Sequence, residues 1–128
     1  MKRDRSQEYR PPPENACTPD EGLIDLALVD GESHYLYRNV QYYRGKVVWF
    51  SLQQGLRRAD GDHVVARVDC CDGEVHRHVF TESEGEIERV SLVRIPLAGH
   101  AVVDGEFDRY LNEMLSSWEG RLREWRKT

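Results

Sequence analysis

The chain has 128 residues, of which 39% are hydrophobic and 32% charged, and 18 basic against 23 acidic residues give a net charge of -5. This length corresponds to one domain whose core can support folding without a metal or a disulfide. The mild acidity argues against whole-molecule electrostatic binding to nucleic acid or to anionic membranes. Repeat arrays and collagen-like structures do not fit this length and composition.

Targeting signals are not recognisable in the sequence. The amino terminus lacks the apolar segment of a signal peptide, and no window approaches the roughly 18 consecutive apolar residues that span a bilayer. Cys17, Cys70 and Cys71 are odd in number and two of them are neighbours, so we expect three reduced thiols. These features predict a cytoplasmic protein that does not bind membranes.

The amino-terminal 20 residues differ in composition from the rest of the chain. They are polar, contain three consecutive prolines at 11–13, and offer little apolar surface to offset the entropy of ordering. We predict a flexible arm over residues 1–20 and a single α+β domain over residues 21–128. The short apolar stretch 22–29, at the start of that domain, fits either a helical turn or a strand.

The central part of the chain has the character of β-strands. Residues 35–43, 46–56, 63–71, 74–80 and 87–95 are rich in β-branched and aromatic residues or alternate between apolar and polar. Asp72-Gly73 suits a two-residue type I′ turn, because that turn needs positive φ at both positions. No spacing suggests a crossover helix. We therefore predict a mainly antiparallel sheet of four to five strands.

The carboxy-terminal part has helical periodicity sustained over five turns. The apolar residues with this spacing are Phe107, Tyr110, Leu111, Met114, Leu115, Trp118, Leu122 and Trp125. Asp104 is the predicted N-cap. The fold class is thus predicted to be α+β, with the sheet packed against one long C-terminal amphipathic helix. The end of the helix that carries Trp118 and Trp125 is a candidate interface.

The Asp72-Gly73 turn brings four ionisable residues together. It pairs Asp69 with His76 and Arg67 with His78, and the period of two places all four side chains on one face of the hairpin. Two histidines can serve as general base and general acid, an arginine can hold a phosphate, and Asp69 can orient His76. This is the composition of a metal-independent ribonuclease site.

The register of the preceding strand affects the same face. Matching the apolar positions of residues 46–56 to those of residues 63–71 requires an odd-length loop or a bulge near Asp60-Gly61. In that register Ser51 and Gln53 lie beside Asp69 and Arg67. We prefer it to a simple two-residue loop, which would place Leu52 beside Asp69.

Two other interpretations of the four residues remain open. His76 and His78 project the same way and Asp69 could supply a third metal ligand, with Cys71 or His63 as a fourth, which would make a zinc site. No other cofactor is predicted. Alternatively, the group is an ordinary solvated, salt-bridged face of an antiparallel sheet.

A second set of residues suggests contacts with nucleic-acid bases. Tyrosines and a tryptophan alternate with basic residues in a pattern that can stack bases, although ordinary strand composition explains it as well. The residues are Tyr35, Tyr37, Tyr42, Tyr43, Trp49, Arg38, Arg44 and Lys46.

Residues 46–80 resemble a known pattern. Ala66-Arg67-Val68-Asp69, followed by Gly73 and by Val75-His76-Arg77-His78, is similar to a group of small bacterial domains with an Arg-Tyr-Asp and a later His-Arg-His. It is distantly similar to the TumE-type toxins of bacterial toxin–antitoxin pairs. The resemblance implies a bacterial cytoplasmic protein in which Arg67, Asp69, His76 and His78 form a unit, with a toxin-like role directed at RNA.

Two functions follow from these observations. The first is an RNA-directed effector with His76 and His78 as the acid–base pair. The second is a non-enzymatic module that binds a protein partner or a second copy of itself, in which the four residues only hold the hairpin in register.

Overall fold

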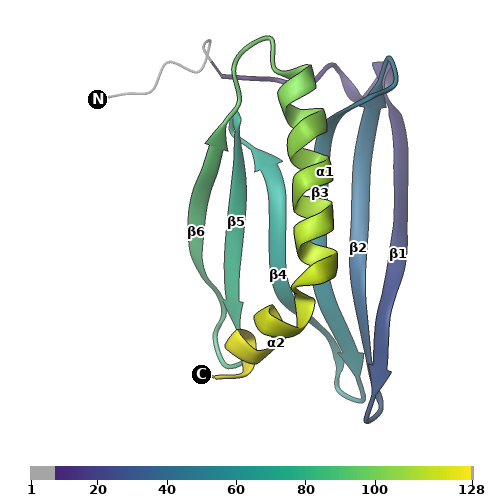
Figure 1. Ribbon diagram of the computed structural model, residues 1–128, viewed down its shortest axis with the longest axis vertical. Helices are drawn as coiled ribbons and strands as arrows, with labels where there is room; N and C mark the ends of the chain where they lie inside the picture. The colour runs from purple at the N-terminus through teal and green to yellow at the C-terminus, as the bar shows by residue number, and fades with distance from the viewer. Residues whose placement is uncertain (1–7, 128) are drawn as a thin grey trace.

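The computed structural model describes residues 8–127 and has one sheet and two C-terminal helices (Figure 1). The strands pair antiparallel in chain order: β1 Thr18–Val29, β2 Glu32–Tyr43, β3 Lys46–Arg58, β4 Gly61–Cys71, β5 Glu74–Thr81 and β6 Gly85–Arg94. The helices are α1 His100–Ser116 and α2 Trp118–Arg126, and a 3-10 turn covers Glu14–Ala16. The α+β class and the antiparallel sheet are confirmed.

The sheet has six strands, so the prediction of four to five was too low. Residues 22–29, which fitted either a helical turn or a strand, belong to strand β1. This strand pairs with β2 from Thr18 to Val29. Asp30 and Gly31 connect the two strands with positive φ angles of 51° and 78°. The apolar run is short for a helix, and the tight turn behind it returns the chain directly into β2.

The predicted single long helix is two helices. The break is at Ser117, whose φ of -119° and ψ of 15° are not helical. The predicted N-cap was also wrong, because α1 begins at His100 after Gly99, and Asp104 instead accepts a hydrogen bond from the main-chain N–H of Val47 at 2.8 Å. Trp125 is buried, so the end of the helix does not present it as an interface.

The central hairpin follows the predicted register. Asp72 and Gly73 have φ of 54° and 74°, as a type I′ turn requires. Strands β4 and β5 pair Asp69 with His76 and Arg67 with His78. On the other side of β4, a bulge at Gln54/Gly55 shifts the register, so that Ser51 pairs with Asp69 and Gln53 with Arg67. The preferred register is confirmed.

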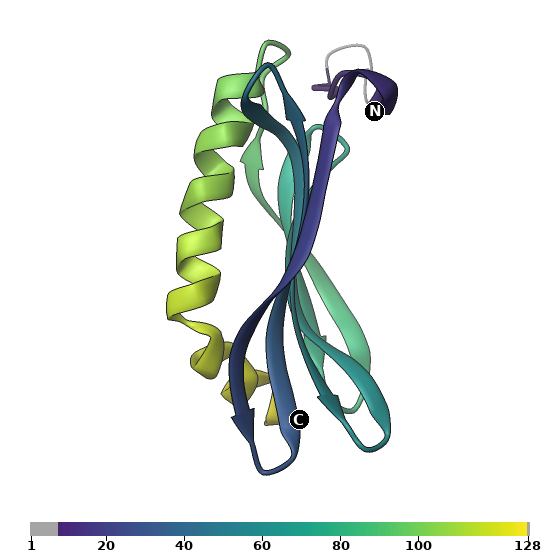
Figure 2. The same ribbon diagram turned by 90° about the vertical axis from the view of Figure 1, so that its right-hand side faces the viewer.

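The two faces of the sheet are covered differently. Helix α1 packs over one face, along β3, while the N-terminal segment crosses one end of the opposite face (Figure 2). The apolar core lies between α1 and the sheet and includes Val40, Phe50, Leu52, Val75, Val103, Phe107 and Met114. We call the side away from α1 the open face. No helix of the described residues is long and apolar enough to span a bilayer.

The boundary of the predicted arm also changes. Strand β1 begins at Thr18, so residues 18–20 belong to the sheet, and residues 1–7 lie outside the described residues. Tyr9 is buried, and its hydroxyl donates a hydrogen bond to the main-chain oxygen of Val48 at 2.7 Å. Tyr9 thus anchors this segment to the end of the sheet.

Candidate functional site

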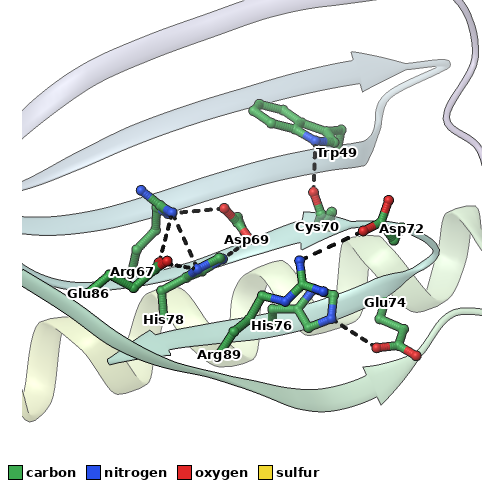
Figure 3. Close-up of polar contacts among 10 residues, drawn as sticks. All are labelled: Trp49, Arg67, Asp69, Cys70, Asp72, Glu74, His76, His78, Glu86 and Arg89. Carbon is green, nitrogen blue, oxygen red and sulfur yellow. Dashed lines mark hydrogen bonds and ion pairs between the residues drawn. The ribbon is translucent and has the colours of Figure 1, made fainter. Parts of the chain in front are cut away.

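The four predicted site residues lie on the open face, on adjacent strands (Figure 3). Arg67 and Asp69 come from β4, and His76 and His78 from β5, where the tight turn and the period of two align them. The structure therefore brings all four together, as the sequence predicts.

His78 is the centre of the contacts. Its Nε2 lies 2.9 Å from Asp69 Oδ1 and its Nδ1 lies 2.6 Å from Glu86 Oε1. Arg67 contacts both carboxylates, with Nε 3.1 Å from Asp69 Oδ2 and Nη2 3.4 Å from Glu86 Oε1. We call Arg67, Asp69, His78 and Glu86 the His78 cluster. Each of its members contacts at least two others.

The protons on the His78 ring decide which of these contacts are hydrogen bonds. The imidazolium form donates to Asp69 and to Glu86, because both of its nitrogens carry a proton. In the neutral form Nε2 donates to Asp69, while Nδ1 accepts from Arg67 Nη2 at 3.3 Å. The contacts with both carboxylates are hydrogen bonds at the same time only when both ring nitrogens carry a proton.

His76 has a different partner from the predicted one. Asp69 was expected to orient His76, its cross-strand neighbour, but its carboxylate contacts His78 on the diagonal. His76 Nε2 instead lies 2.9 Å from Glu74 Oε2, and its Nδ1 is buried with no hydrogen bond. The two imidazole rings have centroids 6.3 Å apart.

Both histidines are buried although no helix covers them. His76 is 4% exposed and His78 is 7% exposed. Salt bridges do surround them, but the expected solvated face is wrong for the two rings. Charged side chains contact both rings: Asp69 and Glu86 of the neighbouring strands contact His78, and Glu74 of the same strand contacts His76 (Figure 3). A substrate would have to displace these contacts to reach either ring.

The local charge does not favour an anionic substrate. Two arginines, Arg67 and Arg89, lie among four carboxylates, which belong to Asp69, Asp72, Glu74 and Glu86. Sequence reasoning missed Glu74, Glu86 and Arg89. Glu74 could have been found, since it is two residues before His76 and faces the same way. Glu86 could not, because it reaches His78 through an irregular β5–β6 register at Val79/Phe80.

The structure offers no preformed metal site. Among residues 8–127, no three His, Cys, Asp or Glu side chains are arranged to hold a metal ion. His63, considered as a fourth ligand, contacts Asp60 at 2.8 Å and packs near Trp125. The zinc hypothesis for His76, His78 and Asp69 thus has no geometric support.

Comparison with family models, with curated proteins and with solved structures gives no match. The resemblance of residues 46–80 to TumE-type toxins therefore stays a prediction.

The neighbouring part of the open face has uncharged side chains on β2 and β3, and the N-terminal segment with Pro11, Pro12 and Glu14 lies beside one end of it. On β2 and β3, every second side chain points away from α1, and cross-strand pairs join Tyr37 to Gln53 and Asn39 to Ser51. We call this group the central patch; its residues are Tyr35, Tyr37, Asn39, Gln41, Trp49, Ser51 and Gln53. All seven side chains are partly exposed.

The predicted aromatic and basic surface is divided between the two faces. Tyr42 packs against the core, and Tyr43 contacts the ring of His100. Arg38 lies opposite Leu52 on the helix side and pairs with Asp20 at 2.7 Å. The open face keeps Tyr35, Tyr37 and Trp49 without Arg38, and Arg44 lies over the ring of Tyr43, so an electrostatic contact with nucleic acid loses support here.

The rim of the central patch is charged and acidic on the β1 side. Glu21 and Asp25 lie opposite Asn39 and Tyr35, and Glu21 accepts a short hydrogen bond from Tyr37. This bond raises the pKa of the Tyr37 hydroxyl, and burial raises the pKa of the Tyr35 hydroxyl. Both hydroxyls are therefore hydrogen-bond donors at neutral pH.

Proposed function

We propose that this protein is a non-enzymatic interaction module that binds a protein partner through the central patch. One observation carries the proposal: seven adjacent open-face positions are uncharged in a chain in which 32% of residues are charged. Protein interfaces are depleted of charge at their centre and enriched in Tyr and Trp. Three of the seven residues are of these types.

The arrangement around the patch also supports an interface. Amides and hydroxyls from Asn39, Gln41, Ser51 and Gln53 provide hydrogen-bonding groups between the aromatic rings. Such mixtures of rigid aromatic and small polar residues are typical of binding surfaces. Charged residues of β1 on one side and the His78 cluster on the other form a polar rim.

The His78 cluster is assigned a structural role in this proposal. Its charged groups bind one another and its histidine is buried; of the described cavities, the only one that His78 lines is the cavity under α1 and α2. General acid–base catalysis needs imidazoles within hydrogen-bond reach of a substrate. The cluster instead links β4, β5 and β6 and so holds the sheet beside the patch.

The charge distribution selects the kind of partner. The chain has a net charge of -5, and Glu21 and Asp25 border the patch. A partner with basic residues around a flat polar contact surface would be complementary. A second copy would bring like charges together, so we propose a different protein and leave the homodimer as an outcome of the test.

The test uses a charge introduced at the centre of the patch. A photoreactive amino acid at position 53 identifies the partner in native cells, and the purified partner is then titrated with wild type, Gln53→Arg and the control Asn112→Arg. Asn112 is exposed on α1, on the other side of the sheet. We expect at least about tenfold weaker binding for Gln53→Arg, since it places an unpaired charge in the contact, and an unchanged affinity for Asn112→Arg.

Three results would contradict the proposal: no partner cross-linked at position 53, equal affinity for the two arginine variants, or a stable homodimer built on the patch. Light scattering of the purified wild-type protein reports the last of these directly.

A second candidate is the ribonuclease of the sequence-based prediction. The observation in its favour is the Asp69–His78 contact at 2.9 Å beside a second imidazole at a ring distance of 6.3 Å. It predicts RNA cleavage by the wild-type protein that is lost in both His76→Gln and His78→Gln. Cleavage that persists in both variants, or none in the wild type, would exclude it.

A further inference from the structure

A cavity of about 600 Å³ lies on the helix side of the sheet, away from the central patch. It exists because α1 lies along β3 and α2 turns across the lower ends of β4 and β5, so that much of β5 and β6 has no helix over it (Figure 1). We call it the helix-side groove. Its volume is within the range of small-molecule binding sites.

The floor of the helix-side groove is apolar. Val68, Val79, Phe80, Met114 and Trp125 line it, from both the sheet and the helices. Ile87 of β6, at the rim, is 49% exposed although it is a large aliphatic residue. Covering this apolar surface with a hydrocarbon ligand would lower the free energy, because it removes the surface from water.

Three arginines line the same groove, and two of them, Arg121 and Arg123, form no ion pair within residues 8–127, although the charge of Glu113 acts on Arg121. Arg77 pairs with Glu113 at 3.1 Å. Among residues 8–127, no carboxylate lies within ion-pair distance of Arg121 or Arg123, and Glu124 is taken by Lys127 at 2.9 Å. The groove thus has three cations against two carboxylates, Glu113 and Glu124, in a protein of net charge -5.

Arg121 is held in place beneath this surface. Its Nε donates to Gln54 Oε1 at 2.9 Å and its Nη2 donates to the main-chain oxygen of Met114. Gln54 is fully buried and is itself fixed by the oxygen of Trp118 at 2.9 Å. These bonds use neutral acceptors, and burial lowers the pKa of the Arg121 guanidinium. A carboxylate at the free Nη1 would compensate this partly desolvated charge.

We propose that the helix-side groove binds a small amphipathic carboxylic acid. The hydrocarbon part lies on the apolar floor, and the carboxylate binds the guanidinium groups of Arg121 and Arg123. Charge complementarity selects an anion, and the apolar lining selects an aliphatic or aromatic body. This inference does not depend on the proposed function, since the groove and the central patch are on opposite faces.

The test compares three compounds that share a chain and differ in the head group. Decanoate, decanol and decyltrimethylammonium are each titrated into the full chain by calorimetry, below their micelle-forming concentrations. We expect decanoate to bind at least about tenfold more tightly than decanol, and the cation to bind most weakly. Backbone amide shifts in NMR spectra should locate decanoate between α2 and β5.

Two matched pairs of variants test the site. Arg123→Glu is compared with Arg109→Glu, which reverses an exposed charge on α1 outside the groove. Ile87→Asp is compared with Leu97→Asp, since Leu97 is 55% exposed and outside the groove. We expect at least about tenfold weaker decanoate binding for Arg123→Glu and Ile87→Asp, and none of this loss for the two controls.

Several outcomes would overturn the inference. Equal binding of decanoate and decanol would mean an apolar surface without carboxylate recognition. Absence of binding by all three compounds, equal losses in groove and control variants, or shifts confined to the central patch would also contradict it.

Discussion

The two faces of the sheet bury polar side chains in different ways. On the helix side, Gln54 is fully buried and bonds to a main-chain oxygen and to Arg121, all beneath the helices. On the open face, His76 and His78 are buried and contact carboxylates from their own strand and from adjacent strands. Burial therefore does not require a covering helix when long charged side chains surround a smaller ring.

The difference has consequences for stability. The apolar core on the helix side depends mainly on buried area and packing, and its few titratable groups, such as Cys70 and His34, contribute while they are neutral. The open face depends on ion pairs whose members would be left unpaired in a low-dielectric layer if one were removed. Perturbations of volume, charge and pH should therefore act differently on the two faces.

The largest difference in the free energy of unfolding is expected between variants of two neighbouring residues on β3. Phe50 is fully buried and its ring lies 5.6 Å from that of Phe107, whereas Trp49 is a partly exposed member of the central patch. Phe50→Ala should lower the free energy of unfolding by about 3–5 kcal/mol, since it leaves a cavity. Trp49→Ala should cost about 1–2 kcal/mol. Urea denaturation measures both, and equal losses would contradict the difference between the faces.

A second contrast lies within the His78 cluster. The side chain of Asp69 is 17% exposed and that of Glu86 is 45% exposed, although both contact His78 and Arg67. Asp69→Asn should lower the free energy of unfolding by about 1–3 kcal/mol, and Glu86→Gln by at most about 1 kcal/mol. Denaturation curves at neutral pH test the order. A larger loss for Glu86→Gln would show that exposure does not rank the two carboxylates.

The helix side should also respond to high pH. Burial raises the pKa of the Cys70 thiol from 9.0 to about 12. The folded state keeps the thiol protonated, so its contribution to stability is complete below pH 9 and is lost as the pH rises toward 12. The free energy of unfolding should therefore fall more steeply above pH 9 in the wild type than in Cys70→Val. Parallel curves for the two proteins would refute this assignment.

The smallest effect concerns His34, which is buried on the helix side beside Trp118 at a ring distance of 5.3 Å. Burial lowers its pKa below the ordinary 6.5, and this outweighs the opposing effect of Glu32. The neutral ring favours the folded state above pH 6.5, and this contribution is lost at lower pH as the unfolded chain takes up a proton. His34→Gln should flatten the stability profile between about pH 5 and 7. A pKa of the His34 ring at or above 6.5, measured by NMR titration, would contradict this prediction.

Local rules were sufficient for the central hairpin and for part of the candidate site. Asp72-Gly73 allows positive φ at two successive positions, and the period of two then aligns Arg67, Asp69, His76 and His78. The apolar alternation of β3 and β4 also identified the correct register, because a slip by one residue would have exposed the core face. Such features depend on neighbours within a few residues or across one turn.

Only the tertiary structure decided the remaining features. Glu86 joins the His78 cluster through irregularities in the β5–β6 register. Helix α1 ends at Ser116, where Gln54 and Arg121 donate hydrogen bonds to carbonyls on either side of the break. The contacts of His78 and the helix-side groove likewise depend on side chains from several strands and both helices. The sequence by itself determined which residues alternate and where one tight turn falls, because backbone conformation and strand period are local. Packing between strands and helices decided which charges meet, because that is settled only when the whole sheet and both helices are in place.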